Sequence, residues 1–340
     1  MAKVSGNYLI ARTLKEEGVD TLFYLMGGPN FDTIMECQDV GIRTIDFRHE
    51  QAAAMAAHAY SRVTGKPSVV MAASGPGTLN LLTGVYTASI DCAPMVILGG
   101  ASAVHEIGRD TFQEVDQVGI MQPLCKYWHR PTMASRFPEV VSTAYRQAQS
   151  GRPGPVYIDC GGDVLYEEVE EESVPTPSRA LKRTRPVAAF GDIERAMALI
   201  ANAERPLLFA GGGAFFSGAA PELEKFVDVT SIPFYTAPMS RGLVPEDHAV
   251  SFQGARSTAM RESDVVLVVG TRMNWMMNYG QRFAPNAKII QIDINEAELG
   301  HNRDIEMGIF GDAKAVMAQL LELAQQRSPD FSGALESPWI

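Results

Sequence analysis

Cysteine is scarce in this sequence, and its spacing excludes two common uses of the residue. Four cysteines occur among 340 residues, at positions 37, 92, 125 and 160. They form no C-x-x-C pair and no combination with histidine at metal-site spacing. We therefore predict reduced thiols in a cytoplasmic protein, without disulfides and without a metal site made by this chain.

Long apolar runs and positive charge are also scarce. No uncharged apolar stretch reaches the roughly 18 residues that a membrane-spanning helix requires, and the N-terminus has no apolar signal core. Asp and Glu outnumber Lys and Arg by 40 to 29, which gives a net charge of −11. This balance argues against nonspecific binding to nucleic acid or to an anionic membrane. A local arginine cluster would still suit an anionic substrate.

The residues that are present follow the repeated order of an α/β fold. The chain has room for two domains, and its composition, 46% hydrophobic and 20% charged, is ordinary. In the first unit we predict strands at 21–25, 42–47, 68–73, 94–100 and within 151–159, and helices at 5–17, 30–37, from 50 onward and through 80–82. Strands alternating with helices predict a parallel sheet covered on both faces, with ligands beyond the carboxyl ends of its strands.

The second unit repeats this order. We predict helices at 191–203, 220–229, 257–262 and 313–326, and strands at 205–210, 232–236, 264–270 and 288–293. This is a Rossmann-like arrangement, but Phe216 stands where G-x-G-x-x-G needs its third glycine, so no NAD site is predicted. An acidic run at 167–172 with prolines after it indicates a solvated linker. The predicted domains are 1–165 and 190–327, with a linker at 166–189 and a tail at 328–340.

Three loops of the first unit follow strands and should meet at one edge of the sheet. They contain Gly27, Glu50 and Gly75. Glu50 stands where an alanine-rich helix begins, and backbone N–H groups and the helix dipole favour a negative charge there. On position alone, an ordinary helix-start carboxylate is the commoner explanation. The neighbouring residues favour a functional one.

Those neighbours resemble a known family. Residues 48–53, Arg-His-Glu-Gln-Ala-Ala, and Tyr-Ser-Arg at 60–62 resemble the first domain of thiamine diphosphate enzymes of the acetolactate synthase and 2-hydroxyacyl-CoA lyase type. The resemblance implies that Glu50 bonds N1′ of the cofactor's aminopyrimidine and promotes the imino tautomer, which deprotonates the thiazolium carbon. Ser-Gly-Pro-Gly at 74–77 and the helix after it look like the segment beside the pyrimidine ring. The expected cofactor-binding residues are Gly27, Glu50, Gly75, Pro76 and Asn80.

Two further positions bear on the substrate. Phe-Gln-Glu at 112–114 resembles the segment that brings a glutamine near the reacting carbonyl, which implies that Gln113 bonds the substrate oxygen and that Phe112 walls the pocket. Oxalyl-CoA decarboxylase usually has Tyr and Glu at these two positions, so the pair favours the lyase. Met26 stands where benzaldehyde lyase has a histidine, which argues against that enzyme's acid/base arrangement.

The second unit also resembles the CoA-using branch. Gly-Ala-Arg-Ser at 254–257 and Thr-Arg-Met-Asn-Trp at 271–275 look like segments of 2-hydroxyacyl-CoA lyase and oxalyl-CoA decarboxylase. Arg256 would suit a CoA phosphate, and a structural salt bridge explains it equally well. Arg152 and Asp293 match, by resemblance, residues around the ADP site of oxalyl-CoA decarboxylase. An aspartate capping the turn after its strand is an equally good explanation of Asp293.

The resemblance stops before the family's third domain. That domain holds the cofactor's diphosphate through Mg²⁺, with a Gly-Asp-Gly and a later Asn-Asn, and neither pattern occurs here. We expect either a fragment or a subunit whose partner chain supplies that domain. We also expect a homo-oligomer, a dimer or tetramer, and no activity of this chain alone.

The predicted function is that of a thiamine diphosphate-dependent carbon–carbon lyase that cleaves or forms 2-hydroxyacyl-CoA. Its expected ligands are thiamine diphosphate, Mg²⁺ held by another domain, an acyl-CoA and, as an open question, ADP. The alternatives are acetolactate synthase-like condensation of 2-oxo acids and oxalyl-CoA decarboxylation. A non-catalytic nucleotide-binding module is an alternative of another class.

Overall fold

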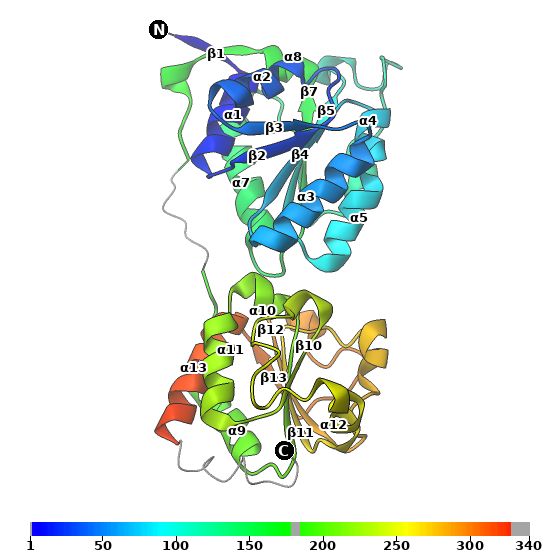
Figure 1. The fold of residues 1–340 in the computed structure, drawn as a ribbon. Helices are drawn as coiled ribbons and strands as arrows, with labels where there is room; N and C mark the ends of the chain where they lie inside the picture. The colour runs from blue at the N-terminus through cyan, green and yellow to red at the C-terminus, as the bar shows by residue number, and fades with distance from the viewer. Residues whose placement is uncertain (1, 178–183, 328–340) are drawn as a thin grey trace. The chain divides into compact units, whose positions relative to one another are not determined.

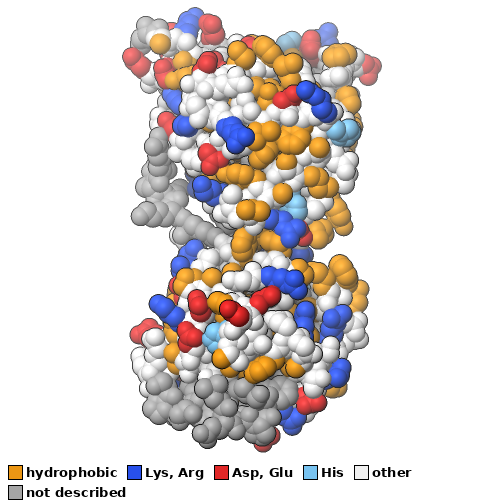
Figure 2. Space-filling view, in the orientation of Figure 1, with side chains coloured by type: hydrophobic (Ala, Val, Ile, Leu, Met, Phe, Trp, Pro, Cys, Tyr) orange, Lys and Arg blue, Asp and Glu red, His pale blue; other side chains and the backbone are white. Residues whose placement is uncertain are grey.

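The structure, a computed structural model, describes residues 2–177 and 184–327. The chain divides into two compact units, residues 1–184 and 185–340, shown in Figure 1. The predicted tail at 328–340 lies outside the described residues. Each unit has its own sheet and its own core, as two predicted α/β domains require. On the face seen in Figure 2, acidic, basic and apolar side chains are mixed.

The first unit is built on a six-stranded sheet in the order β3-β2-β4-β5-β7-β6, in which every pairing is parallel. Its strands are β2 Thr21–Tyr24, β3 Arg43–Asp46, β4 Ser68–Ala72, β5 Met95–Ala101, β6 Tyr127–His129 and β7 Pro155–Gly161. The three central strands, β4, β5 and β7, are buried along their whole length. Such runs are typical of a parallel sheet covered on both faces.

Helices cover both faces of this sheet (Figure 1). Helix α1 packs with α2 and α7, and α3 packs with α5. The helices are α1 Gly6–Glu16, α2 Phe31–Asp39, α3 Glu50–Thr64, α4 Pro76–Asn80, α5 Leu82–Asp91, α6 Gln117–Met121, α7 Phe137–Gln149 and α8 Gly162–Tyr166. Helix α3 starts where predicted, because the His49 side chain caps it by accepting the Gln51 N–H at 3.1 Å.

The first unit extends past residue 165, into the segment predicted to be a solvated linker. Strand β8, Glu168–Glu170, pairs antiparallel with β1, Lys3–Ser5. The next residue, Glu171, accepts a hydrogen bond from Arg12 at 2.9 Å. Acidic composition predicted solvation, but strand pairing and a cation on α1 fix this segment to the first unit. Residues 178–183, also inside the predicted linker, lie outside the described residues.

The second unit has a five-stranded parallel sheet in the order β10-β9-β11-β12-β13. Its strands are β9 Pro206–Ala210, β10 Phe234–Thr236, β11 Val265–Val269, β12 Lys288–Asp293 and β13 Met307–Phe310. Its helices are α9 Phe190–Ala201, α10 Gly212–Ser217, α11 Ala220–Thr230, α12 Arg256–Glu262 and α13 Ala313–Gln326. The predicted fold class is confirmed in both units. The elements that were not predicted from the sequence are β1, β6, β8, β13, α6, α7, α8 and α10.

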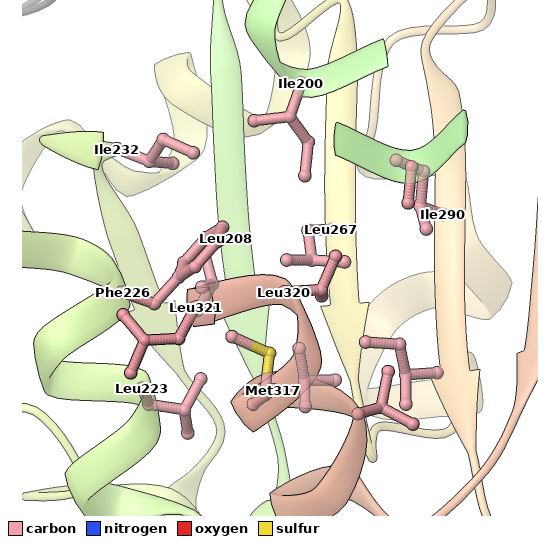
Figure 3. Close-up of a cluster of buried hydrophobic side chains, with 14 of the residues drawn as sticks. Ile200, Leu208, Leu223, Phe226, Ile232, Leu267, Ile290, Met317, Leu320 and Leu321 are labelled. Carbon is pink, nitrogen blue, oxygen red and sulfur yellow. The ribbon is translucent and has the colours of Figure 1, made fainter. Parts of the chain in front are cut away.

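Two cores stabilise the second unit, one on each side of its sheet. On one side α9, α11 and α13 pack against the strands, and Phe226, Leu320 and Leu208 belong to one cluster of buried side chains (Figure 3). On the other side Met260 of α12 packs with Phe209 of β9. The core leaves the loops at the strands' ends for ligands.

Candidate active site

Glu50 is the first residue of α3, and its side chain is only 7% exposed. The side-chain nitrogen of Asn80, the last residue of α4, donates to Glu50 Oε2 at 2.9 Å. Among the described residues, no other side chain donates to this carboxylate. Its second oxygen, Oε1, is therefore available to a ligand. A buried carboxylate with one fixed and one free oxygen is more than a helix-start residue needs.

The loop after β4 lies beside this free oxygen. A Cβ on Gly77 would lie 3.3 Å from Glu50 Oε1 and 3.0 Å from the Ala73 Cβ, so the absence of a side chain lets the loop approach. Gly75 has φ +58°, a left-handed conformation that glycine adopts at little cost. Pro76 follows as the first residue of α4, where a missing N–H costs nothing.

The loop after β2 contacts the same segment. A Cβ on Gly27 would lie 2.6 Å from the Ala73 Cβ, and the Gly28 carbonyl accepts the Ser74 N–H at 3.1 Å. Three segments distant in sequence therefore meet at the carboxyl edge of the sheet, as predicted. Met26, just before this turn, is 54% exposed.

Gln113 reaches the same place from the segment between β5 and α6. Its side-chain oxygen accepts the Ser74 hydroxyl at 2.9 Å, and a Cβ on Gly75 would lie 2.5 Å from its backbone oxygen. Gln113 itself has φ +60°, which costs a non-glycine residue energy and is typical of functional sites. The structure thus brings Gln113 to the Gly75 loop; its expected place near the reacting carbonyl stays a prediction. Its neighbour Phe112 is 83% exposed.

A carboxylate shapes the turn that presents Phe112 and Gln113. Glu114 Oε1 accepts the Gly108 N–H and Oε2 accepts the Thr111 N–H at 3.1 Å. These backbone hydrogen bonds, Gly108 first, lower the pKa of Glu114 below its ordinary value. Glu114 was quoted in the sequence motif without a role, and the structure gives it one.

Arg152 lies at the other edge of the first sheet. It belongs to the turn just before β7, and its Nε donates to the Cys92 Sγ, just before β5, at 3.1 Å. Glu50 and Gln113 lie at the carboxyl ends of the strands. Within the first unit, Arg152 is therefore not part of the group formed by Glu50, Asn80, Gln113 and the Gly75 loop, called the Glu50 cluster below.

Arg256 lines a cavity of about 570 Å³ in the second unit. Its guanidinium carbon lies 5.3 Å from the centre of the Phe209 ring, and its buried Nε has no hydrogen-bond partner among the residues that the structure describes. Burial, and next the charge of Arg282, lower its pKa. The cavity is lined by Arg256, Ser257, Met260, Arg261, Gln281 and Arg282, three arginines and no carboxylate. Such a lining suits an anion.

Asp293 ends β12 and is nearly buried. Its Oδ1 accepts the Asn295 N–H at 2.8 Å. This is the turn-capping contact that the sequence analysis held open. A ribose hydroxyl would have to share the carboxylate with this turn.

Sequence reasoning missed a buried polar network under the Gly75 loop. It consists of Gln117, Arg130, Tyr157 and Asp159. The available signal was Asp159, a charged residue inside the apolar run of β7. Charged residues are almost never fully buried unless they are paired.

Neither the cysteines Cys37 and Cys125 nor any group of possible metal ligands among the described residues forms a second reactive or metal-binding site. Burial raises the pKa of the Cys37 and Cys125 thiols to about 12, so both are unreactive. Within 2–177 and 184–327, no three His, Cys, Asp or Glu side chains are grouped so that they could hold a metal ion. Among the same residues, no helix combines the length and apolar character that crossing a membrane requires.

Comparison with known proteins gives relatives over most of the chain. A 2-hydroxyacyl-CoA lyase of Arabidopsis thaliana is 37% identical over 324 residues, 93% of this chain and 56% of that protein. A probable acetolactate synthase large subunit of Methanococcus aeolicus is 38% identical over 94% of this chain and 55% of its own length. An oxalyl-CoA decarboxylase of Escherichia coli is 34% identical over 94% of this chain and 58% of its own length. The chain thus spans a little over half the length of these relatives.

Two family models match, one for each unit. Residues 4–120 match the N-terminal TPP binding domain of thiamine pyrophosphate enzymes, and residues 193–320 match the central domain of the same enzymes. The first match contains Glu50, Asn80 and Gln113, and the second contains Arg256 and Asp293. The two-domain order and the parallel sheets agree with both matches, and the chain therefore belongs to the thiamine pyrophosphate enzymes.

Proposed function

We propose that the chain activates thiamine diphosphate in a carbon–carbon lyase that cleaves or forms 2-hydroxyacyl-CoA. In the cleavage direction the C1–C2 bond of the thioester breaks, and the products are an aldehyde and formyl-CoA. When bound, thiamine diphosphate supplies an acidic thiazolium C–H and an electron sink for this bond. The observation that carries the proposal is the Glu50 carboxylate, with Oε2 held by Asn80 and Oε1 free beside Gly77.

Glu50 fits the cofactor's aminopyrimidine. The glycine loop leaves room beside Oε1, where a Cβ on Gly77 would crowd the carboxylate. In this proposal Glu50 Oε1 holds the proton at the pyrimidine N1′. Asn80 keeps the carboxylate from rotating, because its amide donates to the other oxygen. Gly27, Gly75 and Pro76 form the wall of the site.

The Gln113 amide can present hydrogen-bond donors to a substrate carbonyl. Its amide oxygen is occupied by the Ser74 hydroxyl at 2.9 Å, so its amide nitrogen presents the donors. We propose that this nitrogen donates to the substrate oxygen, where negative charge develops as the bond rearranges. Phe112 and Met26, both exposed, would cover an acyl chain. A methionine cannot transfer protons, so Met26 itself takes no part in acid/base chemistry.

The arginine cavity of the second unit supports an acyl-CoA substrate. We propose that Arg256 binds a CoA phosphate, because its buried Nε lacks a partner in the described part of the chain and an anion would supply one. The variant Arg256→Gln should raise KM for the CoA thioester by about 5- to 150-fold, as expected for a hydrogen bond of about 1–3 kcal/mol. It should leave KM for the pantetheine thioester unchanged, because that substrate lacks the nucleotide. Arg205→Gln is the matched control, an exposed arginine of the same unit.

A substrate panel tests the reaction itself. The holoenzyme is supplied in turn with a 2-hydroxyacyl-CoA, with oxalyl-CoA and with pyruvate. The proposal expects an aldehyde and formyl-CoA from the first substrate and little turnover of the others. Turnover of pyruvate alone would make the enzyme an acetolactate synthase, and CO₂ from oxalyl-CoA would make it a decarboxylase. Failure with all three would favour the nucleotide-binding module.

The remaining ligands, the oligomeric state and the cellular compartment are also proposals. Mg²⁺ would hold the cofactor's diphosphate through a different domain, in a dimer or tetramer or with a partner chain, and the four unpaired cysteines suit the cytoplasm. ADP would bind near Asp293, and Arg152 would take part only if the assembly brings it there. A nucleotide titration of this chain and of Asp293→Ala checks that site. The absence of binding in both would exclude it.

A further inference from the structure

Gln117 is the first residue of α6 and is only 2% exposed. It borders a cavity of about 150 Å³ that Gln113, Glu114 and Arg130 also line. Its side chain is a single amide, which can accept and donate hydrogen bonds at once. All of its polar atoms are used inside the first unit, next to the Glu50 cluster.

The amide joins three adjacent strands at their carboxyl ends. Its oxygen accepts the N–H of Gly75, which follows β4. Its nitrogen lies 2.9 Å from the Gly100 carbonyl of β5 and 2.9 Å from Asp159 Oδ1 of β7. The strand order β4-β5-β7 makes these neighbours. One side chain thus fixes the loop after β4 relative to the two strands beside it.

Asp159 anchors the amide from below. It is fully buried, accepts the Tyr157 hydroxyl at 2.5 Å through Oδ1, and pairs with Arg130 through Oδ2. Burial, and then the Asp159 charge, raise the pKa of Tyr157 well above its ordinary value, so this phenol stays protonated as a donor. A buried charge with this set of partners has a fixed position.

The Gly75 loop connects the fixed Gln117 amide to Gln113 and Glu50, the two groups assigned to the reaction. Gln113 packs against one side of Gly75, where an added Cβ would lie 2.5 Å from the Gln113 oxygen. Two residues later, Gly77 lies against Glu50, and α4 ends at Asn80, which holds the Glu50 carboxylate. A shift of Gly75 would therefore move both Gln113 and the Asn80 contact.

We propose that Gln117 is a positioning residue: its bond to the Gly75 N–H sets the distance between the Glu50 carboxylate and the Gln113 amide. The inference rests on the proposed function, in which these two groups act on cofactor and substrate. A role confined to stability would cost unfolding free energy without a specific loss of turnover. The two roles predict different results from the same variants.

The first test is hydrogen exchange on this chain. Gln117→Met keeps the length of the side chain and removes every hydrogen bond of the amide. We expect the segment 73–80 to exchange at least about tenfold faster, the factor for about 1.4 kcal/mol of lost protection. Ser61→Ala is the matched control, because Ser61 is equally buried and bonds to Ser68 and Pro94 at the opposite ends of β4 and β5. It should leave 73–80 unchanged.

The second test is kinetic and uses the holoenzyme. Gln117→Met should lower kcat by about 10- to 100-fold, the scale expected for catalytic groups misplaced by up to about 1 Å. KM should stay within a factor of about two, because the CoA contacts lie in another domain. Exchange of the cofactor's thiazolium C2 proton, followed by NMR without substrate, should slow with kcat. Ser61→Ala should change neither.

A second variant keeps the proposal testable if Gln117→Met does not fold. Gln117→Glu restores the acceptor for Gly75, and when protonated it also restores a donor toward Asp159. The groups around it are Asp159, Tyr157 and Arg130, and Glu114 and Asp116 also line the cavity. Its kcat relative to wild type should therefore rise as the pH is lowered. A stability role predicts a flat ratio once both proteins are folded.

These outcomes are distinct from a failure of the proposed function. If the wild type exchanges the C2 proton but does not cleave 2-hydroxyacyl-CoA, the substrate is wrong and C2 exchange still tests Gln117. If Gln117→Met loosens 73–80 yet matches Ser61→Ala in kcat and C2 exchange, Gln117 is purely structural and the inference is overturned. Unchanged exchange at 73–80 would overturn it as well.

Discussion

Replacement of Glu50 by glutamine removes one negative charge and keeps the shape of the side chain. In the structure the carboxylate is buried at the start of α3 and accepts one hydrogen bond, from Asn80. The amide oxygen of a glutamine accepts the same bond. We therefore expect Glu50→Gln to fold and to lose its function for a chemical reason.

The effect on stability should be small. A hydrogen bond to a charged acceptor contributes about 1.5–3 kcal/mol and a neutral one about 0.5–1.5 kcal/mol. A charge in the first helical turn contributes about 0.3–1 kcal/mol more. The neutral side chain is easier to bury, which offsets part of this loss. We expect the free energy of unfolding to fall by about 1 kcal/mol, near the mean for point variants.

The effect on rate should be much larger. Loss of a positioned proton-transfer group costs about 10²–10⁴ in rate, or roughly 3–5 kcal/mol of transition-state stabilisation at about 1.36 kcal/mol per tenfold. The loss should appear in kcat, with KM for the CoA thioester nearly unchanged. Exchange of the thiazolium C2 proton should slow by a similar factor, because it depends on Glu50 and needs no substrate.

A matched control separates this chemistry from a helix-start effect. Glu139 lies in the first turn of α7 and pairs with Arg136 on the surface. Glu139→Gln removes a helix-start carboxylate of the same unit and should leave C2 exchange and kcat unchanged. If Glu50→Gln exchanges the C2 proton at the wild-type rate, Glu50 is only a helix-start residue and the central assignment is wrong.

Three further variants test the surroundings of Glu50. Asn80→Ala removes the one donor to the carboxylate among the described residues; C2 exchange measured by NMR should slow by about tenfold, the equivalent of about 1.4 kcal/mol of lost orientation. Gly75→Ala places a Cβ 2.5 Å from the Gln113 oxygen at φ +58°, and denaturant unfolding should show a loss of more than about 1–2 kcal/mol, because the backbone conformation alone costs about that much and the contact with Gln113 adds to it. Glu114 has a lowered pKa in the folded chain, so its contribution is present above its unfolded pKa of about 4.3 and is lost as the pH falls through the folded value. The stability difference between wild type and Glu114→Gln, measured by urea unfolding, should therefore be constant at neutral pH and vanish in acid.

The fold could be predicted largely because hydrophobic patterning decides it. Apolar runs such as 68–73 and 94–100 indicated strands of a sheet covered on both faces, and β4 and β5 are buried throughout. Strand β6, Tyr127–His129, was missed because it has only three residues, all aromatic. It also lies at the edge of the sheet, where one side has no neighbouring strand among the described residues. Strand β8 was missed because Glu168 and Glu170 flank a single valine, and pairing with β1 outweighs their low strand propensity.

The candidate site also has a part that could be predicted from the sequence and a part that could not. The parallel order predicted that the loops at Gly27, Glu50 and Gly75 meet, because parallel strands bring their carboxyl ends to one edge. No pattern predicted that Ser74 orients the Gln113 amide, because that contact joins residues 39 positions apart. Such contacts depend on backbone conformations that only the folded chain fixes, here a positive φ at Gln113 itself.

The buried network shows what the sequence could have indicated and why it was passed over. Asp159 is a charged residue in the fully buried strand β7, and a charge at such a depth must be paired. Besides Tyr157 of the same strand, its partners are 29 and 42 residues away, at Arg130 and Gln117. A single sequence identifies the charge that needs partners without identifying the partners. Once they are known, the glycine loop has a physical cause for its position, because the amide that binds Asp159 also holds Gly75, and this loop contacts Gln113 at Gly75 and Glu50 at Gly77, the two side chains that we assign to the reaction.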